Sequence, residues 1–115
     1  MKTKFFAIAL MLMFGMLTKA QENTKPVVLN IEKVLANNEK VVNENILVQL
    51  KGSFKSKTDE NNYIFKDETG EIKVYVSNEL KNKVSELENN EIVYIIGKLN
   101  NNRENIFELQ HIKKP

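Results

Sequence analysis

The segment "YIFKDETGEIKVYV", Tyr63 to Val76, decides the fold, because two alternating stretches flank one tight polar turn. Successive side chains of an extended strand point to opposite faces, so this alternation predicts two strands that share one apolar face. Within the turn, Asp67 can accept hydrogen bonds from backbone groups, and Gly70 can take a positive φ that other residues resist. The segment therefore predicts a β-hairpin whose inward face is scaffold, made of Tyr63, Phe65, Ile72, Val74 and Val76.

The opposite face of this hairpin carries Ile64, Lys66, Lys73 and Tyr75. An aromatic ring flanked by ammonium groups suits sugars, anionic ligands or nucleic-acid bases. The same residues also fit an ordinary solvated sheet face, since single exposed apolar residues are normal on protein surfaces. The pattern leaves both interpretations open.

Three further segments alternate in the same way and predict strands: "NILVQLKGSF" (residues 45–54), "EIVYIIGKL" (91–99) and "IFELQHI" (106–112). Clusters of asparagine separate the patterned segments, and asparagine favours turns because it tolerates left-handed backbone. Each of the three strands is expected to turn one apolar row inward. These rows are Ile46, Val48, Leu50 and Phe54; Val93, Ile95 and Leu99; and Phe107 and Leu109.

Two segments follow helical spacing instead. In "NIEKVLANN", Asn30 can cap a short N-terminal helix that has Ile31, Val34 and Leu35 on one side. In "NELKNKVSEL", residues 78–87, the apolar residues recur at intervals of three and four. The resulting order is helix, three strands, helix, two strands.

This order predicts a mainly β fold, the five-stranded OB-fold Greek-key barrel, with a short helix between strands 3 and 4. Such barrels usually bind ligands on the outer face of strands 2 and 3 and on the loops that join strands 1–2 and 4–5. Here those loops are residues 55–62 and 100–105, which add Lys55, Lys57 and Arg103 to the candidate face. Gly52 and Gly97 are expected where strands bend and a side chain would crowd the barrel.

Residues 1–20 have the layout of a secretory signal peptide. A charged start precedes the uncharged run "FFAIALMLMFGML", and small residues lie before an expected cleavage ahead of Gln21. The run is shorter than the roughly 20 residues that a spanning helix needs, although an uncleaved anchor is the alternative. We expect periplasmic export, a flexible lead-in over residues 21–28 and a single OB-fold domain over residues 29–115.

Charge and composition limit the chemistry. The whole chain has 17 basic and 15 acidic residues; residues 1–20 hold three lysines and no acid, which leaves 14 against 15, a net of −1. A nearly neutral domain lacks the positive field of most phosphate-backbone binders, so a nucleic-acid partner is not expected. With no cysteine and one histidine, His111, the chain offers neither a typical zinc site nor a nucleophile motif. We therefore expect no catalysis, metal or cofactor.

The sequence also resembles a known family, the bacterial OB-fold (BOF) family of small periplasmic stress-tolerance proteins. The resemblance rests on "VQLKGSF", "YIFKDETGEIKVYV" and "IVYIIGKL". These match the family patterns V-x-L-x-G, Y-x-F-x-D-x-x-G-x-I-x-V-x-V and V-x-I-x-G. It extends over about residues 29–113, and the middle segment is its specific part.

The resemblance implies an exported, non-enzymatic binding or adaptor domain in envelope stress tolerance, with a small-molecule or cell-wall ligand rather than nucleic acid. Two positions depart from the family pattern. Leu80 stands where members often have tryptophan, and the asparagine run with Arg103 replaces an often acidic loop. Three hypotheses follow: a ligand on the Tyr75 face, single-stranded nucleic acid as the alternative, or a partner protein at an unpaired sheet edge.

Overall fold

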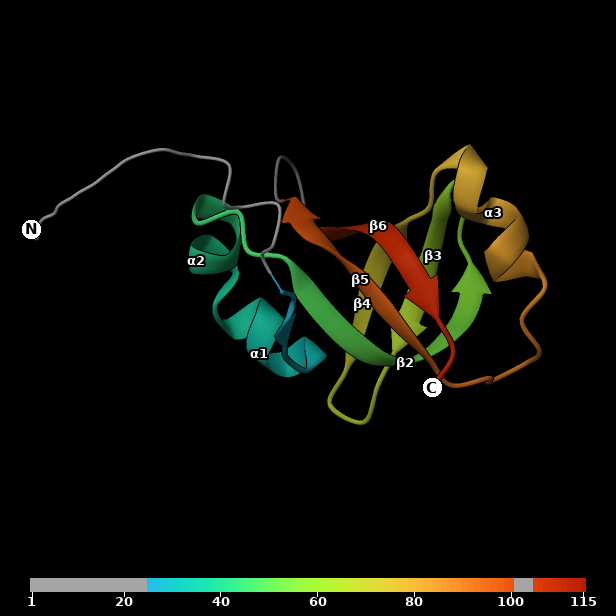
Figure 1. Cartoon of the computed structure of the whole chain (residues 1–115), viewed down its shortest axis with the longest axis horizontal. Helices are drawn as coiled ribbons and strands as arrows, with labels where there is room; N and C mark the ends of the chain where they lie inside the picture. Colours follow the sequence, from blue (N-terminus) through green and yellow to red (C-terminus); the bar gives the residue numbers. More distant parts are fainter. Residues whose placement is uncertain (1–24, 101–104) are drawn as a thin grey trace, which may run out of the picture.

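A closed barrel with helices at both ends forms the centre of the molecule (Figure 1). The computed structural model describes residues 25–100 and 105–115; the expected signal peptide and Arg103 lie outside this part of the chain. The barrel strands are β2 (Val48–Lys57), β3 (Asn62–Lys66), β4 (Glu71–Tyr75), β5 (Val93–Asn100) and β6 (Ile106–Lys113).

Strand pairing confirms the predicted architecture. The sheet has the order β1-β2-β3-β4-β6-β5, and β5 returns to pair with β2, which closes the barrel. The β4–β6 pairing is parallel, whereas β2–β3, β3–β4, β2–β5 and β5–β6 are antiparallel. Helix α3 (Asn78–Ser85) joins β4 to β5, the position expected for the helix of an OB fold.

Strand β2 curves around the barrel and pairs with a different strand in each of its halves (Figure 1). Its first half, Val48 to Gly52, pairs with β5, and its second half, from Ser53 to Lys57, pairs with β3. A Cβ built on Gly52 would collide with the carbonyl oxygen of Lys66, and one built on Gly97 would collide with that of Glu108. Both glycines therefore allow main chains to approach closely, as predicted.

A register shift between Phe54 and Ser56 marks a bulge at Lys55. Phe54 pairs with Phe65 and points inward, whereas Ser56 pairs with Ile64 on the outer face. The extra residue thus reverses the alternation of the last part of β2. It also moves the start of the following loop, since β2 continues to Lys57 rather than ending at Phe54.

The barrel interior is lined by the apolar rows predicted from the sequence, except that Ile46 lies before the start of β2 and is only partly buried. Phe54 stacks edge-on against both Tyr63 and Phe65, with ring centroids 5.7 and 5.1 Å apart. Tyr63 and Phe54 lie near the barrel rim and are only partly buried, whereas Phe65 is fully enclosed. Buried β-strand residues of the core are Val48, Leu50, Phe65, Ile72, Val74, Val93, Ile95, Leu99, Phe107 and Leu109. Ile96 is buried too, but it pairs with the exposed His111 and lies outside this cluster.

The N-terminal region differs from the expectation in two ways. Val27 and Val28 form a short strand, β1 (Val27–Val28), that pairs in parallel with the start of β2, so the expected lead-in is ordered at its end. The predicted helix is present as α1 (Ile31–Ala36), but a second helix, α2 (Asn38–Asn43), follows it directly. A residue with positive φ, Asn45 (54°), then leads the chain toward β2.

The polar turn of the hairpin holds the N-terminus of α1. The backbone N–H of Ile31 donates to Oδ2 of Asp67 (2.9 Å), and that of Glu32 donates to Oγ1 of Thr69 (3.0 Å). Asn30 accepts from the N–H of Lys33, as predicted for a capping residue. The first three helical N–H groups, which a helix cannot satisfy itself, are thereby all paired.

The turn does not use Gly70 as predicted. We expected Gly70 to have a positive φ, but its φ lies outside the positive range. Oδ1 of Asp67 accepts hydrogen bonds from the backbone N–H groups of Thr69 (2.7 Å) and Gly70 (3.1 Å). The aspartate side chain therefore closes the turn without left-handed backbone at Gly70.

Helix α3 covers the barrel end opposite α1 and α2 (Figure 1). Val84 is buried and Leu80 packs against the core from a partly exposed position, in agreement with the helical spacing. Leu87 also packs against the core, but it lies beyond the end of α3. Lys81 of α3 forms an ion pair with Glu60 (3.0 Å), which ties the helix to the loop before β3. Along the described residues, no helix has the length and apolar character needed to cross a membrane.

Candidate ligand-binding face

The outer face of the hairpin brings together four of the seven predicted site residues. Ile64 of β3 lies directly opposite Lys73 of β4, and both alternate away from the buried row of Phe65, Ile72 and Val74. The residues that share this surface, here called the β3–β4 face, are Asn62, Ile64, Lys66, Glu71, Lys73 and Tyr75.

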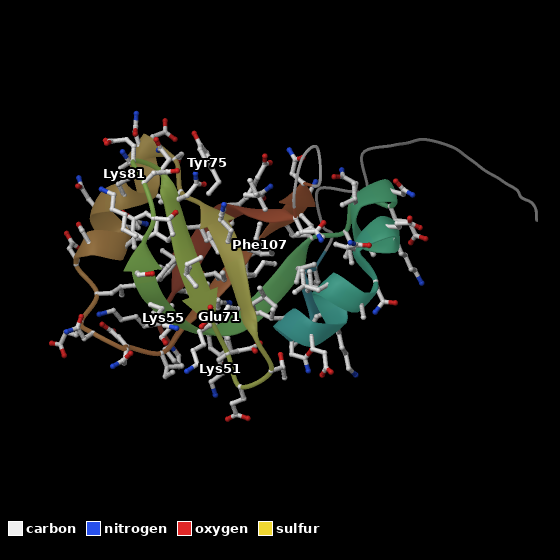
Figure 2. All side chains as sticks on the ribbon, turned by 180° about the vertical axis from the view of Figure 1, so that it is seen from behind. Lys51, Lys55, Glu71, Tyr75, Lys81 and Phe107 are labelled. Carbon is white, nitrogen blue, oxygen red and sulfur yellow. The ribbon has the colours of Figure 1, made fainter. Side chains whose placement is uncertain are left out.

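Tyr75 is the most exposed aromatic group on this face. The residue is 42% exposed, whereas Val74 and Val76 on either side in the chain are fully buried. Strand alternation explains the contrast, since neighbouring residues point to opposite faces. Figure 2 shows Tyr75 at one end of the hairpin and Glu71 at the other.

Strand β6 extends the face beyond β4. In the parallel register, Lys73 is paired with Ile106 and Tyr75 with Glu108. Tyr75 is therefore flanked by an amide on β3, from Asn62, and by a carboxylate on β6. Glu108 is held in place by a hydrogen bond from Nδ2 of Asn100 to its Oε2, 2.9 Å long.

Lys55 joins this face from the bulge in β2. Its Nζ lies 2.8 Å from Oε2 of Glu71, and the two side chains lie next to each other in Figure 2. The hydrogen bond from Lys55 is the main cause that lowers the pKa of Glu71. Because both groups are exposed, this pair orients side chains more than it stabilises the fold.

One described residue of the predicted site is not brought to the face. Lys57 pairs with Tyr63, whose ring belongs to the inner row, so the bulge places Lys57 on the other side of the sheet from Ile64. Arg103 lies outside the described residues. The predicted loop of residues 55–62 is shorter than expected and consists of residues 58–61.

This loop is organised by hydrogen bonds that sequence analysis did not anticipate. Oδ1 of Asp59 accepts from the backbone N–H groups of Asn61 and Asn62 and from the Asn62 side chain. These bonds lower the pKa of Asp59, with the Asn62 side chain as the largest cause and Lys73 as a small one. Asn61 in turn donates to the carbonyl of Val76 (2.8 Å) and so fixes the loop to the end of β4.

The face is balanced in charge rather than basic. The face carries Lys55, Lys66 and Lys73 together with Glu71 and Glu108. In addition, the positive charge of Lys73 lowers the pKa of Asp59 slightly. Alternation along β4 could have revealed Glu71 from the sequence. Glu108 could not be found that way, since its place depends on the pairing of β4 with a strand more than thirty residues later.

The acidic side chains and His111 are the other candidates for chemistry in the described part of the chain. Within residues 25–100 and 105–115, no group of three histidine or acidic side chains is placed to hold a metal ion. His111 is exposed on β6 and pairs with Ile96 of β5, and no serine is hydrogen-bonded to it among the described contacts. The face offers an exposed aromatic ring, some aliphatic surface, and both ammonium and carboxylate groups that can form hydrogen bonds.

A five-stranded closed barrel with a helix between its third and fourth strands is the architecture of the OB-fold class. The family model described as "Bacterial OB fold (BOF) protein" matches residues 19–114. The chain belongs to the bacterial OB fold (BOF) family.

Solved structures agree with this assignment. The hypothetical protein ygiW from E. coli is similar to this chain with a TM-score of 0.60 at 20% identity, over 77% of this chain and 90% of that one. The S. pombe Stn1-Ten1 complex contains a chain with a TM-score of 0.55 at 13% identity, over 80% of this chain and 78% of that one. At these identities the likeness concerns the fold. No curated protein sequence matches the chain.

Proposed function

We propose that this protein is an exported, non-enzymatic OB-fold binding module that holds a small sugar-like or weakly anionic envelope ligand on the β3–β4 face. The observation that carries the proposal is Tyr75, an exposed ring with the Glu108 carboxylate beside it on β6 and Lys73 two residues before it on β4. Aromatic rings offer apolar contact, while carboxylate and ammonium groups exchange hydrogen bonds with hydroxyls.

The charge balance of the face favours a ligand with few charges. Glu71 and Glu108 would repel successive phosphates of a nucleic-acid strand, and Glu71 already engages Lys55. A sugar-like ligand, by contrast, can use donors and acceptors together. The same face could instead bind a partner protein whose surface presents hydrogen-bond donors and acceptors together.

The role in envelope stress and the periplasmic location belong to this proposal. They are supported by the signal-peptide layout of residues 1–20 and by the family match, which begins at residue 19, close to the expected cleavage before Gln21. Fractionation of cells that produce the full chain tests the location: protein of the cleaved mass in the periplasmic fraction supports it, and uncleaved protein in the membrane fraction contradicts it.

The ligand proposal is tested with the double variant Tyr75→Ala/Lys73→Ala. Both substitutions lie on the outer face, so we expect the fold to persist and binding of soluble cell-wall saccharide fragments to fall about tenfold or more, in line with the loss of an aromatic anchor. Binding is measured as a rise in melting temperature and by calorimetric titration.

A matched control is available elsewhere on the barrel. Lys51 lies over the ring of Tyr94, with its Nζ 6.0 Å from the ring centroid, on the β2–β5 part of the surface. Lys51→Ala/Tyr94→Ala removes the same two residue types and should bind like the wild type. Equal binding by wild type and by Tyr75→Ala/Lys73→Ala would refute the role of the face.

A further inference from the structure

A second hollow lies at the α3 end of the barrel, away from the β3–β4 face. Helix α3 ends at Ser85, and the chain then passes through residues 86–92 before β5 begins at Val93. Strand β6 continues to Lys113, beside the start of β5. Between the helix and these two strand ends remains a cavity of about 260 Å³, here called the α3–β6 pocket.

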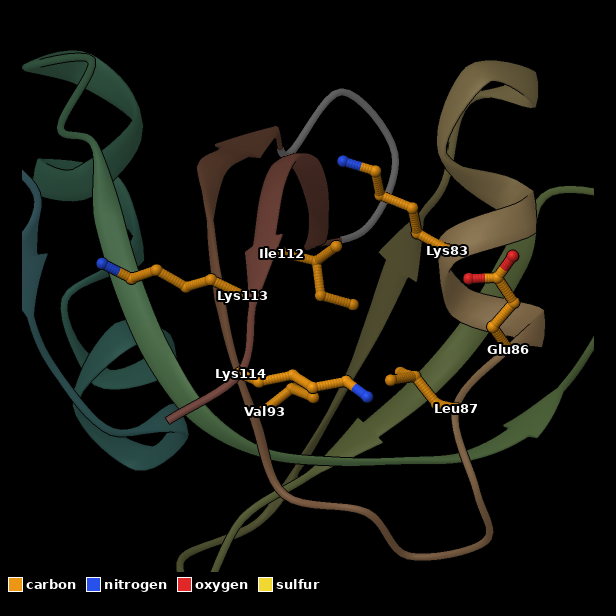
Figure 3. Close-up of a pocket in the computed structure, with 7 residues that line it drawn as sticks. All are labelled: Lys83, Glu86, Leu87, Val93, Ile112, Lys113 and Lys114. Carbon is orange, nitrogen blue, oxygen red and sulfur yellow. The ribbon is translucent and has the colours of Figure 1, made fainter.

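The floor of the α3–β6 pocket is apolar. Leu87, Val93 and Ile112 line it, and Val93 is fully buried while Leu87 and Ile112 pack against the core from partly exposed positions (Figure 3). Apolar surface left facing a concave hollow gains free energy when a hydrocarbon group displaces water from it. The size is slightly below the range typical of small-molecule sites, which favours a short chain over a large ring system.

The rim of the pocket is positive. Lys83, Lys113 and Lys114 line it, with Glu86 as the acidic member of the lining. Figure 3 shows Lys114 reaching across Val93 toward Leu87, and Lys83 extending above Ile112, whereas Lys113 extends away from the floor. Lys83 from α3 and Lys114 from the chain just after β6 thus line the same apolar hollow, on either side of Ile112 in this view.

One of these ammonium groups is already oriented by a carboxylate. Nζ of Lys114 lies 3.2 Å from Oε2 of Glu91, and Oε1 of Glu91 accepts a hydrogen bond from the backbone N–H of Glu88 (2.9 Å). A lysine ammonium has three donors, so this contact leaves capacity for a second anionic group. Glu91 therefore positions Lys114 at the pocket, and the ammonium group of Lys114 keeps donors for a further anion.

From this arrangement we infer that the α3–β6 pocket binds a small amphiphile with one carboxylate head, of the class of medium-chain fatty acids. The alkyl chain occupies the floor of Leu87, Val93 and Ile112, and the carboxylate lies between Lys83 and Lys114. None of these residues belongs to the β3–β4 face, so this site is independent of the proposed saccharide ligand.

The test uses decanoate below its micelle-forming concentration, with decyltrimethylammonium and acetate as matched probes. We expect decanoate to shift the methyl resonances of Leu87, Val93 and Ile112 and to raise the melting temperature. Acetate lacks the chain and decyltrimethylammonium carries the wrong charge, so both should bind more weakly. Equal binding of decanoate and decyltrimethylammonium, or methyl shifts confined to other parts of the barrel, would overturn the inference.

Side-chain substitutions test the rim. Lys83→Gln/Lys114→Gln keeps the aliphatic stems and removes two charges, and we expect decanoate affinity to fall about three- to tenfold, as for two exposed charge contacts. Lys33→Gln/Lys40→Gln removes two charges from α1 and α2 and serves as the control, with wild-type affinity expected. Unchanged affinity in the first variant, with the fold verified by its amide spectrum, would contradict the proposed role of the two lysines.

Discussion

Gly97 lies where the main chain of β5 comes close to that of β6, and a Cβ has no room there. A Cβ at this position would collide with the carbonyl oxygen of Glu108 and lie 2.8 Å from a ring carbon of Phe107. Both obstacles are rigid, because one is main chain and the other is a fully buried ring. Gly70, in contrast, would place a Cβ 3.6 Å from a methyl carbon of Ile31, an ordinary contact distance.

We predict that Gly97→Ala lowers the free energy of unfolding by about 1–3 kcal/mol, the usual range for overpacking a well-packed site. Gly70→Ala is the matched control and should change it by no more than about 0.5 kcal/mol. Urea unfolding followed by circular dichroism measures both values. Equal stability of the two variants would show that β5 and β6 can separate at Gly97 without cost.

At the scale of elements, the hairpin turn and α1 stabilise each other. Asp67 uses one carboxylate oxygen for the N–H of Ile31 and the other for the turn. A carboxylate at the N-terminus of a helix also interacts favourably with the helix dipole. Helix α1 is only six residues long, and isolated helices of this length do not persist in water, so its docking to the turn is essential to its structure.

Asp67 makes stability depend on acid pH. Partial burial raises its pKa, but hydrogen bonds from Thr69, Ile31 and Gly70 together outweigh this effect and lower the pKa below its usual value. A lowered pKa in the folded state means that Asp67 contributes stability above its unfolded pKa, about 3.9. This contribution is lost as the pH falls from about 4 through the folded pKa.

We predict that Asp67→Asn unfolds more easily than the wild type at pH 7, by about 1–2 kcal/mol, because its NH₂ group faces a backbone donor. The difference should shrink below pH 4, where the wild-type carboxyl becomes protonated. Melting temperatures between pH 7 and pH 2.5 measure this. Glu68→Gln removes one acid from the same turn and is the control; a constant difference between Asp67→Asn and wild type across this range would contradict the assignment.

For the whole molecule, the OB topology alone would suggest single-stranded nucleic acid as the partner, whereas the charge distribution does not. Many OB barrels bind single-stranded nucleic acid, yet residues 21–115 carry a net charge of −1, and the β3–β4 face mixes lysines with Glu71 and Glu108. Binding to a phosphate backbone depends on the release of counterions by clustered cations. The balanced surface favours a ligand recognised by shape and hydrogen bonds.

We therefore predict no retardation of single-stranded DNA at micromolar protein and low salt in a gel-shift experiment. A basic variant with Glu71→Lys and Glu108→Lys is the positive comparison, since it turns the same face cationic, and it should gain salt-sensitive binding. Tight binding by the wild type that weakens steeply with salt would instead support the nucleic-acid alternative.

Alternation along the chain was sufficient to predict the five barrel strands and, apart from Ile46, their inward rows, because burial with period two or 3.6 is a local property of sequence. The helix predicted over residues 78–87 forms as α3 and ends at Ser85. Alternation also placed Ile64, Lys66, Lys73 and Tyr75 on one face. Gly52 and Gly97 each interrupt an apolar row of a strand, which predicted that another main chain approaches closely there.

Contacts between distant segments decided the remaining features. The bulge at Lys55 separated Lys57 from the β3–β4 face, and the parallel β4–β6 register brought Glu108 beside Tyr75. The turn at Asp67 captured α1, whose first N–H group lies 36 residues away in the chain. Bulges, register and long-range caps minimise the energy of the packed barrel as a whole, so no local pattern encodes them.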